Sequence, residues 1–192
     1  ENDGAANTVG SPASAKNCVS VGGTLNSTSC NSYYTTTSRG PTDDGRYKPT
    51  ILTPGSGITS AGSGTSSYIS MSGTSMSSPG ACASGALARQ YLREGWYPTG
   101  KKVAGNVWGY ISAAMIKAVL INCADPNISG YTVPDNNIGW GRIDLDSTLY
   151  FSGDSRKTLL DDDTIGVLTG ERADYHFSVP SGTADLKITV VW

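Results

Sequence analysis

The sequence predicts an α/β domain over residues 1–151, followed over residues 152–192 by the start of an antiparallel β domain. Three observations lead to this prediction. Short β-branched runs closed by Gly or Pro are typical of buried strands. Two later segments carry apolar or small residues at helical spacing. Beyond residue 145, apolar and polar residues alternate between Gly, Pro and Asp turns, which is typical of antiparallel strands.

The first third of the chain predicts two short strands and long polar loops. Residues 16–25, KNCVSVGGTL, contain a β-branched run that ends at two glycines and predict a buried strand. Residues 27–47 are rich in Ser, Thr, Asn and Tyr and predict a loop. In residues 48–61 two prolines flank an apolar stretch, which predicts a second strand, and the Gly- and Ser-rich residues 62–67 predict a surface loop.

Two helices are predicted after these strands. The stretch SSPGACASGALARQYLREGWYP begins at Ser77, with Pro79 tolerable in a first helical turn and Pro98 beyond the end. Its many small residues predict a helix held tightly between neighbours, the buried central helix of the fold. Residues 112–124, SAAMIKAVLINCA, predict a second helix with one apolar face.

Composition narrows the class of protein. Hydrophobic residues make up 38% of the 192 and charged residues 16%, which is typical of a globular protein. The formal charge of −2 provides no basic surface for a phosphate backbone, so we expect no nucleic acid partner. No stretch approaches the roughly 18 apolar residues of a membrane span. We expect both ends to lie inside a longer protein, because no initiator Met opens the chain and an apolar run closes it.

The cysteines do not predict a metal site. Cys18, Cys30, Cys82 and Cys123 show no C-x-x-C spacing, and the chain has one histidine, so a zinc site is not expected. Cys18 and Cys30 either form a disulfide, if the protein is exported, or remain free. Cys82 and Cys123 lie in helical segments and are expected to be core thiols.

The stretch GTSMSSP, residues 73–79, places a serine where its hydroxyl could react. Ser75 follows Gly and Thr at the start of the small-residue helix, where unpaired backbone N–H groups can stabilise an oxyanion. A serine hydroxyl nevertheless needs a neighbouring base before it attacks. The residues alone leave two interpretations open: a nucleophile, or a serine that caps a buried helix.

GTSMSSP resembles the serine signature of the subtilisin-like serine peptidases, usually Gly-Thr-Ser-Met-Ala/Ser-x-Pro, and this resemblance implies that Ser75 is the nucleophile. Residues 38–55, SRGPTDDGRYKPTILTPG, resemble the family stretch that precedes this serine, with Thr50 at the usual Asp and Thr53 at the usual Ala. RQYLREGWYPTG, KAVLINCA and NIGWGRIDLDSTLYF resemble a branch with a C-terminal jelly-roll domain. The implied fold is the C-terminal half of a parallel-sheet peptidase domain, then the start of a β-sandwich.

The resemblance also implies an oxyanion residue and a substrate-binding set. ENDGAANTVGSPASAKNCVSVGG is similar to a family segment that begins Gly-Asn-x-Gly, with Glu1 where the first Gly usually stands. Asn2 would then donate its side-chain amide to the developing negative charge. The residues expected to bind substrate are Gly10, Ser11, Pro12 and Thr74.

The family triad also needs an Asp and a His, which precede the oxyanion Asn in chain order. The one histidine, His176, follows Ser75 by about a hundred residues, in ADYHFSV, and is expected to be a structural or solvated strand residue. We therefore expect the catalytic Asp and His to come from an N-terminal part of the same peptidase. This chain alone is expected to be inactive, because triad members act as a unit.

Calcium is the ion that the resemblance implies, as a structural ion, and no organic cofactor is expected. The candidate ligands are Asp161, Asp162 and Asp163, with Asp43 and Asp44 as a second pair, although neither group has EF-hand spacing. The predicted function is that of an exported serine endopeptidase acting on proteins or peptides through an acyl-enzyme. The alternative is a pseudopeptidase fragment that acts as a binding or docking module.

Overall fold

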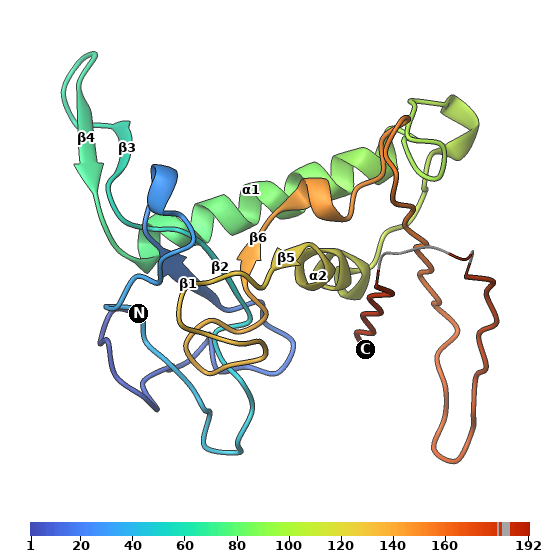
Figure 1. Ribbon diagram of the computed structural model, residues 1–192, viewed down its shortest axis with the longest axis horizontal. Coiled ribbons are helices and arrows are strands. Elements are labelled where there is room, and N and C mark those ends of the chain that lie inside the picture. The colour runs from blue at the N-terminus through green and yellow to red at the C-terminus, as the bar shows by residue number, and fades with distance from the viewer. Residues whose placement is uncertain (180, 182–184) are drawn as a thin grey trace.

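A four-stranded sheet organises the first 150 residues of the computed structural model, which describes residues 1–179, 181 and 185–192. The strand order is β1-β2-β6-β5. The strands are β1 (Val21–Thr24), β2 (Ile51–Pro54), β5 (Ala124–Asp125) and β6 (Arg142–Ile143). Strand β2 pairs in parallel with both β1 and β6, and β5 is antiparallel to β6. The α/β prediction with a parallel sheet is confirmed, and both early strands lie inside their predicted segments (Figure 1).

Two helices lie beside the sheet: α1 (Thr74–Arg93) and α2 (Ala113–Asn122). The second matches its predicted segment, and the Ser112 hydroxyl caps it by accepting from the backbone N–H of Met115. The first begins three residues earlier than predicted, because Gly73 at the N-cap adopts a φ of 147° that residues with side chains rarely adopt. Pro79 consequently lies inside the helix rather than in its first turn.

Three clusters of buried side chains join these elements. One lies between the C-terminal half of α1 and α2, and includes Leu92, Met115 and Val119. A second joins the sheet to both helices, with Ile51, Ala81, Leu120 and Cys123. The third includes Tyr33, Leu52, Ile128 and Ile138 and packs loops against the sheet. The sheet and the start of α1 are therefore held by one continuous set of contacts.

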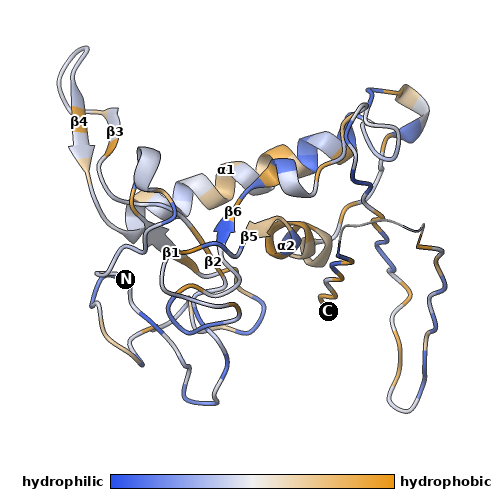
Figure 2. Cartoon of the chain, in the orientation of Figure 1, coloured by the Kyte–Doolittle hydropathy of each residue, from blue (hydrophilic) through white to orange (hydrophobic). Residues whose placement is uncertain are grey.

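The prediction that α1 is buried on every side is wrong for the described chain. Only six of its residues are buried: Thr74, Ser77, Ala81, Ala88, Tyr91 and Leu92. Another face, which includes Cys82, Ala83, Ala86 and Leu87, is exposed, and Leu87 is 55% exposed. Figure 2 shows that α1 alternates between hydrophilic and hydrophobic residues along its length, whereas α2 is more uniformly hydrophobic. Ala81 and Ala88 are thus buried as expected, whereas Ala83 and Ala86 face solvent because no described segment covers them.

A hairpin that the sequence analysis did not predict leads into the serine segment. Strand β3 (Ile58–Ala61) pairs antiparallel with β4 (Tyr68–Met71), and the predicted Gly- and Ser-rich loop connects them. The hairpin projects from the rest of the structure just before α1 (Figure 1). Three short 3-10 turns complete the secondary structure of the described residues: Ser27–Ser29, Ala104–Asn106 and Leu145–Ser147.

The strands predicted beyond residue 152 are not present in the structure. The described residues of this segment form no helix or strand, and the alternating apolar residues are exposed: Leu186 is 58%, Ile188 62%, Val190 72% and Trp192 86% exposed. An alternating segment becomes a strand only when a neighbouring strand pairs with its backbone and another layer covers its apolar face. The described segment meets neither condition.

Candidate active site

Ser75 is the second residue of α1 and its side chain is exposed. Two hydrogen bonds tie this end of the helix to the end of β2. The backbone N–H of Gly73 donates to the carbonyl of Gly55 at 2.8 Å, and the hydroxyl of Thr53 donates to the carbonyl of Ser77 at 2.6 Å. The serine is therefore presented to solvent by a helix start that is anchored on its buried side.

Close backbone approach is needed around this helix start. Ser77 is fully buried, and its hydroxyl lies where a Cβ at Gly55 would stand, whereas a Cβ at Gly23 would come 3.3 Å from the same hydroxyl. A Cβ at Gly55 would overlap the Ser77 hydroxyl and would also come within 3.0 Å of the carbonyl oxygen of Gly73. Only residues without side chains fit between the sheet and the first turn of α1.

The structure brings Asn2 against the residue that precedes the predicted nucleophile. The Asn2 side-chain oxygen accepts from the backbone N–H of Thr74 at 2.8 Å and lies 3.2 Å from the Thr74 hydroxyl. Because the oxygen is engaged, the Asn2 Nδ2 group is oriented away from this contact. Among the described residues, no acceptor lies within hydrogen-bond reach of Nδ2. Its two N–H bonds are free to donate elsewhere.

A second free donor lies in the first turn of α1. The backbone N–H of Ser75 has no i−4 partner, as for every first-turn residue of a helix. None of the described residues accepts a hydrogen bond from it. Asn2 Nδ2, beside Thr74, and the Ser75 N–H are therefore two donors without a partner among the described residues, and unpaired donors of this kind can stabilise an oxyanion.

The predicted substrate-binding residues divide into two groups. Gly10 lies near this region, since its backbone N–H donates to the Glu1 carboxylate at 2.7 Å, and Ser11 and Pro12 follow it on an exposed loop. Lys48 anchors the far end of this loop by donating to the carbonyls of Ala15 and Cys18, and burial lowers the pKa of its ammonium group. Thr74 forms the second group: it is only 6% exposed, and its hydroxyl donates to the carbonyl of Glu1 and to the side-chain oxygen of Asn2.

His176 belongs to the irregular tail. Figure 1 shows the chain beyond residue 157 at the end of the molecule away from the start of α1. His176 is exposed and makes no hydrogen bond to the serine. The exposed side chain agrees with a solvated His176, whereas the strand expected around it is absent from the described tail.

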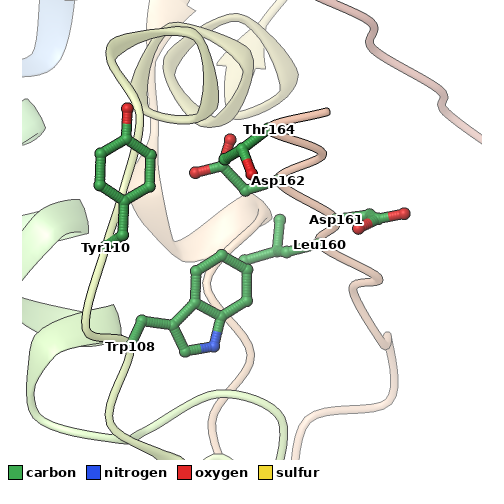
Figure 3. Close-up of a pocket in the computed structure, with 6 residues that line it drawn as sticks. All are labelled: Trp108, Tyr110, Leu160, Asp161, Asp162 and Thr164. Carbon is green, nitrogen blue, oxygen red and sulfur yellow. The ribbon is translucent and has the colours of Figure 1, made fainter. Parts of the chain in front are cut away.

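The three consecutive aspartates have separate contacts. Asp162 accepts hydrogen bonds from the backbone N–H of Ser112 at 2.7 Å and from its hydroxyl at 2.6 Å, which secures the start of α2. Asp163 accepts from the Tyr175 hydroxyl. Figure 3 shows the carboxylate of Asp161 pointing away from that of Asp162, which points toward Tyr110 at a pocket also lined by Trp108. The chain, outside its four undescribed residues, gathers no three His, Cys, Asp or Glu side chains as a metal site. Calcium stays a prediction.

The cysteines are all free thiols in the structure. Cys18 and Cys30 are half-buried and unbridged, so the disulfide alternative is not realised. Cys82 is exposed, contrary to its expected place in the core, because it lies on the uncovered face of α1. Cys123 is fully buried as expected, and burial raises the pKa of its thiol to about 11.

The sequence analysis missed Ser38 and Arg39 as residues of the site region. Ser38 shares two hydrogen bonds with Asp3, and Arg39 donates to the carbonyl of Gly4 at 2.6 Å. The sequence did offer a signal for them, because both residues lie in SRGPTDDGRYKPTILTPG, the stretch that resembles the family segment before the serine. Their partners are about 35 residues away in sequence, so the pattern did not indicate which loop they contact.

The chain is similar in sequence to curated proteins whose names combine serine protease with ABC transporter. Among curated relatives, the chain is 37% identical over 177 residues to the Serine protease/ABC transporter B family protein tagA of Dictyostelium discoideum, which covers 80% of this chain and 10% of that protein. It is also 37% identical over 145 residues to tagD of the same organism, covering 59% of this chain and 8% of tagD. The chain thus spans about a tenth of the length of these relatives.

Two solved structures share the fold. The Clostridium perfringens CspB protease superposes with a TM-score of 0.55 at 27% identity, over 74% of this chain and 28% of that one. The prenylagaramide maturation protease PagA superposes with a TM-score of 0.54 at 22% identity, over 76% of this chain and 46% of that one. The family model for the subtilase family matches residues 1–141, which is most of the chain and includes both Asn2 and Ser75. The chain belongs to the subtilase family.

Proposed function

We propose that this chain is the nucleophile-bearing part of a serine endopeptidase that hydrolyses peptide bonds through an acyl-enzyme. One observation carries the proposal: an exposed Ser75 at a helix start, with the Asn2 amide oriented by Thr74 and free to donate. In this mechanism Ser75 Oγ attacks the peptide carbonyl and loses its proton to a histidine base. Asn2 Nδ2 and the Ser75 N–H stabilise the oxyanion. The histidine gives this proton to the amine nitrogen as the C–N bond breaks, and water then hydrolyses the acyl-enzyme to release the acid and free Ser75.

The catalytic Asp and His are proposed to come from another part of the same peptidase. The uncovered face of α1 supports this arrangement, because Leu87, Ala83 and Ala86 expose apolar surface along the helix that carries Ser75. Burial of that face would favour association of the two parts. Protein or peptide substrates follow from the family.

The tail and the location of the protein remain proposals. We propose that residues 152–192 contribute strands to a jelly-roll-like β domain, since Leu186, Ile188 and Val190 alternate and are exposed. An extracellular location is proposed from the family alone. Within the described residues, no helix combines the length and apolar character needed to cross a membrane.

A fluorophosphonate that labels activated serines tests the function. The full-length protein, purified in native form, is expected to carry the adduct on Ser75, located by peptide mass. Ser75→Ala is expected to abolish labelling, because the nucleophile is gone. Ser78→Ala is the matched control, since Ser78 is also an exposed serine of α1, and labelling should persist. Absence of a Ser75 adduct would contradict the proposal and favour the docking-module alternative.

A further inference from the structure

The loop that carries Asn2 has no regular secondary structure, so other segments must hold it. Residues 1–8 lie against residues 36–40 through five backbone hydrogen bonds. Residues 36–40 donate two of these bonds, from Ser38 N–H to the carbonyl of Glu1 and from Arg39 N–H to the carbonyl of Ala5, both at 3.1 Å. In a third, the Gly4 N–H donates to the carbonyl of Thr36 at 2.9 Å. The remaining two join Asn7 to Gly40 and Thr8 to Arg39.

The Arg39 guanidinium adds a contact that a backbone pair cannot supply. Its Nη2 group donates to the carbonyl of Gly4 at 2.6 Å, two residues after Asn2. Its Nη1 group donates to the side-chain oxygen of Asn137 at 3.0 Å. The two nitrogens of one planar group thus join the Asn2 loop to a turn that lies 98 residues after Arg39 in the chain. A lysine ammonium is a single point donor and does not reproduce this fork.

The turn on the other side of Arg39 is itself well anchored. Asp135 Oδ1 accepts from both the backbone N–H and the side-chain amide of Asn137, at 2.6 Å each. Asp135 and Gly139 exchange two backbone hydrogen bonds, and Trp140 N–H donates to the carbonyl of Thr50 beside β2 at 3.0 Å. A continuous series of contacts therefore runs from the sheet through this turn and Arg39 to the Asn2 loop.

Gly4 shows how little freedom the loop has at this point. Its φ is +61°, and a Cβ there would lie 3.0 Å from the carbonyl oxygen of Thr35. The backbone that Arg39 contacts is thus already in close contact with the segment behind it. Displacement of the Gly4 carbonyl would shift the backbone that leads directly to Asn2.

We propose that Arg39 is a positioning residue for the oxyanion donor, acting through the carbonyl of Gly4 to hold Asn2 Nδ2 in register with Ser75. This inference rests on the proposed peptidase function. Oxyanion stabilisation demands donors about 2.7–3.1 Å from the charge that develops. A displacement of about 1 Å, even from a distant substitution, can lower the rate by about 100-fold.

The test is a double-mutant cycle on peptide hydrolysis by the full-length protein. Arg39→Lys keeps the positive charge but removes the paired guanidinium donors, and Arg39→Met removes both the charge and the donors. With Asn2 present, each is expected to lower kcat by about 10- to 100-fold while KM changes little, since the donor acts in the transition state. In an Asn2→Ala background the same substitutions are expected to change kcat by less than about twofold, because no donor is left to position.

Controls separate positioning from general damage. Arg93→Lys is the matched control, because Arg93 Nη1 also donates to backbone carbonyls, those of Trp108 and Gly109, near the opposite end of α1. Fluorophosphonate titration gives the fraction of active protein, so kcat refers to folded enzyme. Asn137→Ala keeps the contact to Gly4 and removes the other anchor, which provides a milder variant if Arg39→Met does not fold.

Each result decides the inference. A loss of kcat with Asn2 present that vanishes in Asn2→Ala supports it. An equal loss in both backgrounds, or no loss in either, overturns it while the peptidase function stands. If the unsubstituted protein neither turns over peptides nor labels at Ser75, the proposed function fails and this inference fails with it.

Discussion

Gly55→Ala is predicted to displace the start of the nucleophile helix. The added Cβ would overlap the hydroxyl of the fully buried Ser77 and stand 3.0 Å from the Gly73 carbonyl oxygen. The Ser77 hydroxyl has no hydrogen-bond partner among the described residues and is fully buried, so it has little room to move away from the added Cβ. Overpacking of this kind costs about 1–3 kcal/mol of folding free energy. The same shift should move Ser75 and lower kcat.

Urea denaturation of the full-length protein measures the loss of stability, with Gly105→Ala as the control. A Cβ at Gly105 would meet no atom within 4 Å, so that variant should be unchanged or up to about 1 kcal/mol more stable. Ser77→Ala removes the overlapping hydroxyl, and Gly55→Ala combined with Ser77→Ala should recover at least about 0.5 kcal/mol through coupling of the two sites. Equal stability of Gly55→Ala and Gly105→Ala, or no recovery in the double variant, would refute the packing argument.

Three further outcomes are expected. Burial raises the pKa of Cys123 from 9.0 to about 11, so only the unfolded thiol ionises in this range and stability should fall by about 1–3 kcal/mol as pH rises from 9 to 11; urea denaturation of Cys123→Ala should lack most of that fall. Asp162→Ala should destabilise the protein by about 1–2 kcal/mol in thermal or urea unfolding, because Ser112 loses two hydrogen bonds, whereas Asp161→Ala should stay within about 0.5 kcal/mol; a difference that disappears on chelation of calcium would contradict this assignment. Iodoacetamide should modify exposed Cys82 in the native protein and buried Cys123 only after unfolding, as followed by peptide mass; equal rates would show that the core is open.

Local chemistry explains which elements were predictable. β-branched residues next to Gly or Pro indicated β1 and β2, and the Ser112 cap before an apolar segment indicated α2. The stretch GTSMSSP placed Ser75 at a helix start on local grounds, but only its resemblance to the family signature implied that Ser75 is the nucleophile. The hairpin β3–β4 was missed because neither of its strands, ITSA and YISM, alternates strictly between apolar and polar residues.

Two predictions depended on neighbours that the described structure does not contain. The many small residues of α1 suggested a helix covered on all sides, yet Leu87 and Ala83 are exposed in the described structure. The alternation beyond residue 152 suggested strands, but a strand needs a partner for its N–H and C=O groups, and none of the described segments pairs with it. Composition shows that a segment can be buried or paired, not what covers or pairs with it.

The sequence by itself indicated the short strands and a serine at the start of a helix, because each depends on residues within one turn or one strand of each other. The resemblance of GTSMSSP to the family's serine signature, rather than local geometry, implied that Ser75 is the nucleophile. Only the tertiary structure decided that the Asn2 side-chain oxygen faces Thr74 and leaves Nδ2 free, and that Arg39 joins Gly4 to Asn137. These contacts link positions 35 to 98 residues apart, and 72 for Asn2 and Thr74. Such pairs meet only after the sheet and α1 have packed, since hydrogen bonds of 2.6–3.0 Å demand a geometry that local sequence does not define.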